Sequence, residues 1–136
     1  MRRSVSRRIA RPDAVRNLDE IVAASDGMIV ARGELAVEMG PEPVPFVQKV
    51  VMKRAKQVAA AADFQYPIFV STQIMESMIH SHVPTRAEVN DAMNAVWDGA
   101  DVLMCSGETA KGEYPVEGAK SMVASARMAD SQKRFI

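Results

Sequence analysis

Short apolar runs alternate with longer amphipathic stretches along the chain. Three runs are apolar along most of their length, which is typical of strands buried on both faces of a sheet: Gly27 to Ala31, Pro67 to Thr72 and Asp101 to Cys105. In the stretches between them, apolar residues recur at the spacing of one helix face. Because strands that alternate with helices form parallel sheets, the pattern predicts an α/β fold.

Residues that favour helix ends mark the predicted helices. Proline suits the first helical turn, and Thr85 with Glu88 has the pattern of a capping box, in which each side chain accepts a hydrogen bond from the other residue's amide. We expect helices from Pro12 to about Ser25, from Pro45 to about Ala62, from Arg86 to about Asp98 and from Pro115 onward. The last of these has an apolar side made of Val116, Ala119, Val123 and Ala126.

Composition narrows the class of protein. Hydrophobic residues make up 48% and charged residues 25% of the chain, as in ordinary soluble globular proteins. Lys plus Arg equals Asp plus Glu at 17 each, so the net charge indicates neither a nucleic acid nor a membrane surface as partner. No apolar run reaches the roughly 20 residues of a membrane span. The single cysteine, Cys105, excludes an internal disulfide and favours a reducing cytoplasm.

The start of the chain is basic, and only Asp13 offsets its arginines. A transit peptide and a truncated or frayed start are the two interpretations, whereas a secretory signal is not supported because no apolar region follows. Within this segment, Val5 to Ala10 has the character of a remnant strand, which brings the expected number of βα units to about four. The arginines are Arg2, Arg3, Arg7, Arg8, Arg11 and Arg16.

Polar residues gather directly after the carboxyl ends of the three predicted strands, where parallel α/β folds place their functional sites. The clusters are Arg32 to Glu34, Ser71 to Gln73 and Ser106 to Thr109. Gly33 can present backbone amides to an anion at low steric cost. Taken alone, each cluster is more typical of ordinary turn residues than of a functional site, because serine, threonine and glycine are common at strand ends.

Four motifs, in order and at matching spacing, resemble the pyruvate kinase family: Met28 to Leu35 (MIVARGEL), Ser71 to Met78 (STQIMESM), Pro84 to Glu88 (PTRAE) and Ser106 to Gly112 (SGETAKG). The resemblance covers about Ile9 to Met128 and implies strands five to eight of that family's (β/α)₈ barrel. The expected fold is therefore a partial TIM-type (β/α) barrel with a parallel sheet. We expect residues 1–11 to form a basic segment with the remnant strand, and residues 12–136 to form the half barrel.

The resemblance also implies an activity, namely phosphoryl transfer from phosphoenolpyruvate to ADP, giving pyruvate and ATP, with Mg²⁺ or Mn²⁺ and with K⁺. It implies that the amides of Gly33 and Glu34 and the hydroxyl of Thr72 hold the substrate carboxylate, that Arg32 orients their loop or contacts the ligand, and that Lys111 contacts the nucleotide phosphates. The role implied for the amides of Gly33 and Glu34 is physically reasonable, because the first amides of a helix favour a small anion such as a carboxylate.

Three positions depart from the family pattern. Glu34 stands where the family has an aspartate that ligates the divalent ion, and a Lys-Ile-Glu pattern on the preceding strand reads Arg8-Ile9-Ala10 here. Arg8 therefore takes the position of the catalytic lysine, while Ala10 supplies no metal ligand. These departures leave two further interpretations open: a non-catalytic module that binds phosphoenolpyruvate or another subunit, and a fragment without a separate role.

Half a barrel leaves two open sheet edges, at Val5 to Ala10 and at Asp101 to Cys105. Unpaired strand edges invite association with another chain. We therefore expect a homo-oligomer or association with another barrel half.

Overall fold

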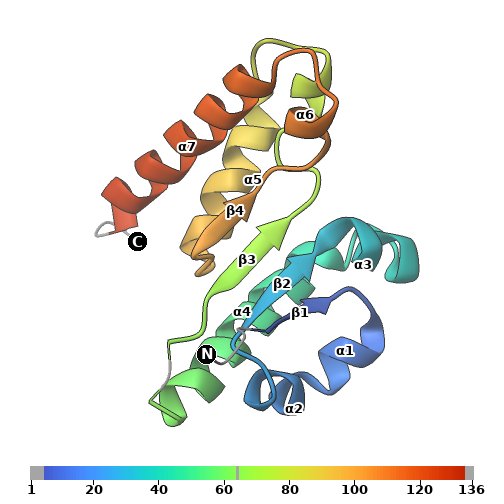
Figure 1. Ribbon diagram of the computed structural model, residues 1–136, viewed down its shortest axis with the longest axis vertical. Coiled ribbons are helices and arrows are strands. Elements are labelled where there is room, and N and C mark those ends of the chain that lie inside the picture. Colours follow the sequence, from blue (N-terminus) through green and yellow to red (C-terminus); the bar gives the residue numbers. More distant parts are fainter. Residues whose placement is uncertain (1–4, 64, 134–136) are drawn as a thin grey trace. The chain divides into compact units, whose positions relative to one another are not determined.

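The computed structural model describes residues 5–63 and 65–133, and in this range the chain divides into two compact units (Figure 1). The first unit comprises the residues up to Val70 together with Asp98–Val102. The second comprises Ser71–Trp97 and the residues from Leu103 onward. Arg2 and Arg3 of the basic segment lie outside the described residues, and the division between residues 11 and 12 stays a prediction.

The described strands are β1 Ser6–Ile9, β2 Gly27–Ala31, β3 Ile68–Ser71 and β4 Val102–Met104. They are parallel and follow one another in the order β1-β2-β3-β4. In the first pair, the partners run from Ser6 with Gly27 to Ile9 with Val30. This arrangement confirms the predicted α/β fold, and β1 lies where the remnant strand was expected.

The helices of the first unit differ from the prediction near the start of the chain. The expected single helix from Pro12 to about Ser25 is wrong, because two helices occupy this stretch, α1 Pro12–Arg16 and α2 Leu18–Ala23. Asn17 separates them with φ −99° and ψ 25°, outside the helical range. Asparagine has a low helix propensity because its side chain competes for backbone hydrogen bonds. The other helices of this unit are α3 Arg32–Met39 and α4 Val44–Ala61.

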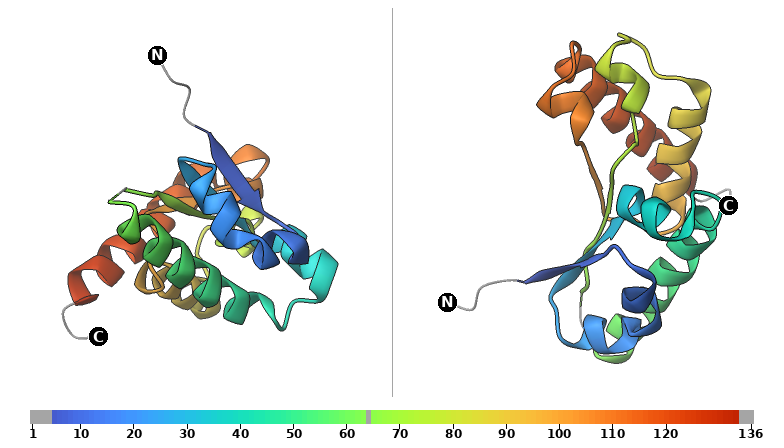
Figure 2. Two further views of the ribbon diagram at one scale, coloured as in Figure 1. Left: turned by 90° about the horizontal axis from the view of Figure 1, so that it is seen from below. Right: turned by 90° about the vertical axis from the view of Figure 1, so that its right-hand side faces the viewer.

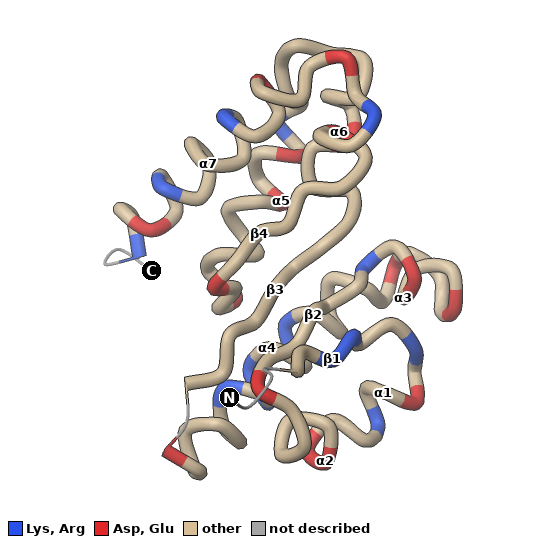
Figure 3. Tube along the Cα trace, in the orientation of Figure 1, with Lys and Arg blue, Asp and Glu red and all other residues tan. Residues whose placement is uncertain are grey.

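In the first unit β1 pairs with β2 and α2 packs against α4, and Figure 2 shows the course of these elements. An ion pair also joins these helices, because the Arg54 guanidinium of α4 binds both carboxylate oxygens of Asp19 of α2. Figure 3 shows positive and negative residues interspersed along both units. The buried residues of the first unit include Leu18, Val22, Met28, Val30, Val51, Met52 and Ala55.

The second unit contains a 3₁₀ turn, η1 Glu76–Ile79, and the helices α5 Arg86–Trp97, α6 Gly107–Ala110 and α7 Pro115–Gln132. Its core forms where α5 packs against α7. Trp97 Nε1 donates a hydrogen bond to the carbonyl of Ala129 at 3.0 Å, so this tryptophan is a packing residue between the two helices.

The apolar face predicted for α7 is wrong. Val116 and Val123 are 56% and 46% exposed, and the buried side consists of Gly118, Met122, Ser125 and Ala129. Both stripes have helical spacing, so the periodicity alone could not choose between them. Small residues on the buried stripe allow close packing, and a Cβ at Gly118 would lie 3.7 Å from the Glu108 side chain.

The strand predicted at Asp101 to Cys105 is present as β4, but it is not buried. Val102 and Met104 are 38% and 36% exposed. β4 is the last strand in the sheet order, so it has one strand neighbour rather than two. Val102 and Met104 are two residues apart and therefore share one face of β4, and it is this face that is not fully covered.

None of the helices in residues 5–63 and 65–133 is both long enough and apolar enough to cross a membrane.

The capping box at the start of α5 is confirmed and is larger than the sequence pattern indicated. The Glu88 amide donates to Thr85 Oγ1 at 3.2 Å, and Glu88 Oε2 accepts from the Thr85 amide and hydroxyl at 2.8 Å each. The same carboxylate accepts the amide and hydroxyl of Ser77 at 2.6 Å each, which ties η1 to α5. Burial alone would raise the pKa of Glu88, but these hydrogen bonds from Ser77 and Thr85 hold it below its ordinary value of 4.5.

We expect the Glu88→Gln variant to lose stability in a pH-dependent way. Because the folded-state pKa of Glu88 is lowered, its charge stabilises the fold above pH 4.5, and this contribution is lost as the pH falls through the folded pKa. The variant should be less stable by about 1 kcal/mol at pH 7, with a smaller difference at pH 3. Urea unfolding at both pH values measures this. Glu117→Gln, at an exposed residue of α7, is the control, and a difference for Glu88→Gln that is equal at both pH values would contradict the prediction.

Candidate functional site

The carboxyl end of β2 leads directly into α3, and this turn carries the first predicted polar cluster. Arg32 is the first residue of α3, and Gly33 and Glu34 follow in its first turn. Ala31, at the N-cap, has no side-chain acceptor for the first amides of the helix. The first-turn amides of a helix lie at the positive end of its dipole and favour an anion. The local backbone therefore suits a small carboxylate or phosphate.

The carboxyl end of β1 brings Arg8 to the same turn. Its guanidinium donates a hydrogen bond to the Glu34 carboxylate, and the two side chains form an ion pair in which each is 52% exposed. Parallel pairing of β1 with β2 places the two strand ends side by side, which makes this contact possible across 26 positions of sequence. Motifs in the sequence indicated both residues, but not their pairing.

Thr72 lies directly after β3, at the start of the second unit, and is half-buried. Its φ of 71° and that of Gln73, 53°, lie in the left-handed region. A β-branched residue rarely adopts this conformation, because its side chain clashes with the backbone there. Such strain costs about 1 to 3 kcal/mol and is found preferentially at functional positions.

Lys111 ends α6 in the second unit and is exposed. Its amide donates to the carbonyl of Gly107 at 3.0 Å, which closes the short helix. Position 112 requires glycine, because an added Cβ would lie 2.4 Å from the carbonyl oxygen of Glu108. The loop that carries Lys111 is therefore held by its backbone on both sides of the lysine.

Glu108 is a buried carboxylate whose importance the sequence did not reveal. It is fully buried, and its Oε2 accepts hydrogen bonds from the Ser106 amide at 2.9 Å and the Ser106 hydroxyl at 3.2 Å. Oε1 has no hydrogen-bond partner among the described residues. Burial, followed by the charge on Glu108, raises the pKa of the Cys105 thiol. Only the motif around Ser106 could have drawn attention to this residue.

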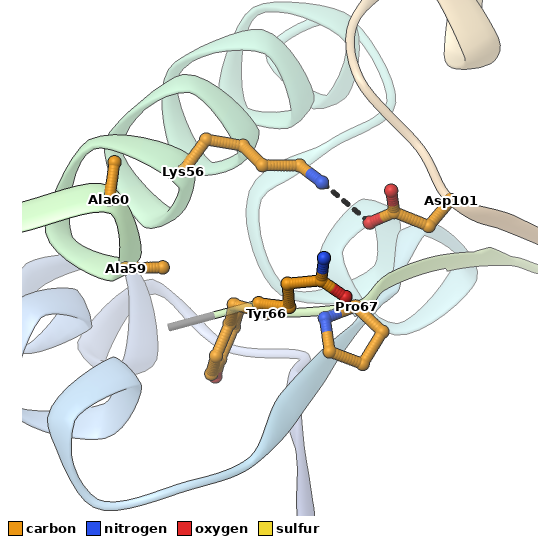
Figure 4. A pocket seen from close by; sticks show the side chains of 7 residues that line it. Lys56, Ala59, Ala60, Tyr66, Pro67 and Asp101 are labelled. Carbon is orange, nitrogen blue, oxygen red and sulfur yellow. Dashed lines mark hydrogen bonds and ion pairs between the residues drawn. The ribbon is translucent and has the colours of Figure 1, made fainter. Parts of the chain in front are cut away.

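A hollow of about 600 Å³ lies at the other end of the strands, beside the amino end of β3 (Figure 4). Lys56 Nζ donates to the Asp101 carboxylate at 2.6 Å, and the same carboxylate accepts the Ile68 amide at 2.8 Å. Tyr66 and Pro67 complete much of its lining. Because parallel barrels place chemistry at the carboxyl ends of their strands and use the amino ends for stability, we assign this hollow to the scaffold.

Parallel strands that alternate with helices, with polar turns beyond their carboxyl ends, define the chain as part of a (β/α) barrel. Residues 3–119 match the family described as "Pyruvate kinase, barrel domain", so the chain belongs to the pyruvate kinase family.

Similar proteins agree with this assignment. A pyruvate kinase of Thermococcus litoralis is 43% identical over 129 residues, which are 95% of this chain and 26% of the relative. One of Methylorubrum extorquens is 48% identical over 118 residues, 87% of this chain and 23% of the relative. One of Thermotoga maritima is 44% identical over 128 residues, 94% of this chain and 26% of the relative. The chain therefore spans about a quarter of the length of these relatives.

The divalent ion that the family implies does not fit the residues present at the ends of β1 and β2. Glu34, the one carboxylate at the ligand positions that the resemblance implies, forms an ion pair with Arg8. Ala10 has no oxygen to offer in its side chain. Magnesium demands near-octahedral oxygen ligands, and this donor set does not supply them.

We expect strain at Thr72 to appear in its variants. Thr72→Gly and Thr72→Ala both remove the hydroxyl, but only glycine adopts a positive φ without steric cost. Thr72→Gly should therefore be more stable than Thr72→Ala by about 1 kcal/mol, as measured by urea unfolding. Ser121, inside α7, is the control, because there the alanine variant should be the more stable one. An alanine variant at Thr72 as stable as the glycine variant would show that the site is unstrained.

Proposed function

We propose that this chain is a phosphoenolpyruvate-binding segment of the pyruvate kinase barrel whose own phosphoryl transfer is weak or absent. The observation that carries the proposal is the turn from β2 into α3, where Gly33 and Glu34 present the first amides of a helix. Membership of the pyruvate kinase family supports the choice of ligand.

Each proposed residue has a role that its chemistry supports. The amides of Gly33 and Glu34 bind the substrate carboxylate, and Arg32 orients their loop. The Thr72 hydroxyl can donate a directional hydrogen bond to an anionic ligand, and the strained backbone at Thr72 is consistent with a functional position. Lys111, exposed at the end of α6, contacts nucleotide phosphates as a mobile positive charge.

The departures explain why turnover should be weak. Phosphoryl transfer depends almost entirely on positioning and on stabilising the charge that develops on the phosphoryl oxygens. Arg8 is a planar guanidinium engaged with Glu34, whereas a lysine offers a compact charge that can approach one oxygen. Loss of one preorganised electrostatic contact costs about 10²- to 10³-fold in rate. This pairing favours the non-catalytic interpretation over an active phosphotransferase.

Calorimetry and an activity assay test the proposal together. Phosphoenolpyruvate should bind saturably, while pyruvate formation from phosphoenolpyruvate and ADP with Mg²⁺ and K⁺ should be at least about 10²-fold slower than that of a full-length relative. Thr72→Ala should weaken binding about tenfold, as for the loss of a hydrogen bond to a charged group, and Thr72→Ser should retain it. Thr85→Ala, in the α5 capping box, is the matched control. Turnover at the relative's rate or absence of binding would refute the proposal.

We also propose that the chain associates with a second copy or with another barrel half, in the reducing cytoplasm that its single cysteine favours. Exposed Val102 and Met104 on the edge strand β4 support this association.

Light scattering at micromolar concentration should therefore show a mass above that of the monomer. Val102→Lys/Met104→Lys should shift the mass toward the monomer, because charged residues on an edge strand oppose pairing. Val37→Lys/Phe46→Lys, at residues 87% and 69% exposed on α3 and α4, is the control. A sharp monomer mass for the unchanged chain, together with cooperative unfolding, would refute the association.

A further inference from the structure

Arg8 and Glu34 pair at the position where a catalytic divalent ion belongs in the family. The pairing follows from the strand geometry of the first unit, because Ile9 of β1 lies opposite Val30 of β2 and is fully buried. Side chains alternate along a strand, so Arg8 and Ala10 share the face opposite to Ile9. The Arg8 guanidinium on that face reaches the Glu34 carboxylate in the first turn of α3.

The three residues that depart from the family pattern are the two partners of this ion pair, Arg8 and Glu34, and Ala10, which lies two residues after Arg8. A carboxylate at residue 10 would stand on the same strand face as Arg8, but Ala10 supplies none. The remaining carboxylate, Glu34, already receives a positive charge and a hydrogen bond from Arg8. A divalent ion would have to displace the guanidinium from that carboxylate and then complete its coordination shell with fewer protein oxygens.

The chemistry of the two cations explains how one can replace the other. A guanidinium stays protonated and is weakly hydrated, and its fork of N–H groups matches a carboxylate. It neutralises Glu34 without the ordered shell of six oxygens that Mg²⁺ requires. The longer side chains of arginine and glutamate, in place of lysine and aspartate, give this pair the reach to meet across the two strand ends.

We propose that the Arg8–Glu34 ion pair takes the place of the divalent ion, so that the ends of β1 and β2 do not bind Mg²⁺ or Mn²⁺. A second consequence rests on the proposed function: phosphoenolpyruvate binds to this chain equally well with and without a divalent ion.

Titration with Mn²⁺, followed by the electron paramagnetic resonance of the free ion, tests the first statement without reference to activity. The unchanged chain should show no saturable binding up to millimolar Mn²⁺. Arg8→Ala/Ala10→Glu removes the guanidinium and adds a carboxylate on the same strand face, and it should bind Mn²⁺ at least tenfold more tightly. Arg7→Ala/Ala24→Glu carries the same charge change at other exposed positions of the first unit and should behave like the unchanged chain.

Two results would overturn the inference. One is saturable Mn²⁺ binding by the unchanged chain that is lost in a Glu34→Gln variant shown to be folded by circular dichroism. The other is an Arg8→Ala/Ala10→Glu variant, folded by circular dichroism, that binds Mn²⁺ no more tightly than the control.

Calorimetry of phosphoenolpyruvate in EDTA and in Mg²⁺ tests the second statement. We expect dissociation constants that agree within threefold, and a requirement for Mg²⁺ would overturn the inference. Absence of phosphoenolpyruvate binding in both buffers would refute the proposed function alone, because the Mn²⁺ titration decides independently whether the ion pair has replaced the metal.

Discussion

Parallel pairing of β1 with β2 is the constraint on which the candidate site depends. The register that sets Ile9 against Val30 buries the Ile9 side chain, and Arg8 projects from the opposite face of β1. It also places the end of β1 beside the first turn of α3. A shift by one residue would turn Ile9 outward and Arg8 into the core, so the same apolar contacts that stabilise the sheet also hold the Arg8–Glu34 pair in place.

Local features of this fold could be predicted from the sequence, whereas features set by packing could not. The capping box of Thr85 and Glu88 forms within four residues, and its hydrogen bonds follow from residue type alone. Which face of α7 is buried depends on how α7 packs against α5. Two stripes of residues on α7 have helical spacing, so the periodicity alone does not decide between them. The buried stripe contains Gly118 and Ser125, whereas Val116 and Val123 are exposed, so hydrophobicity alone did not decide the outcome.

The candidate site shows the same division. The sequence identified Gly33 and Thr72, because motifs at the ends of apolar runs mark the functional edge of a parallel sheet. It could not give the left-handed backbone of Thr72, since no local rule places a β-branched residue there. Nor could it give the contact of Arg8 with Glu34, which depends on a register across two strands. The charges at the ends of β1 and β2 are therefore set by a contact between residues that are 26 positions apart in the sequence.

Fold and chemistry rest on different residues in this chain. The chain is 43% and 48% identical to two pyruvate kinases over most of its length, which accords with a shared barrel scaffold. The reaction depends on very few side chains, and Arg8, Ala10 and Glu34 meet at one end of two adjacent strands. Loss of one metal ligand would leave the other carboxylate without its counterion, and the Arg8–Glu34 pair removes that unbalanced charge. The barrel scaffold can therefore persist while the electrostatics at its strand ends change from a metal site to an ion pair.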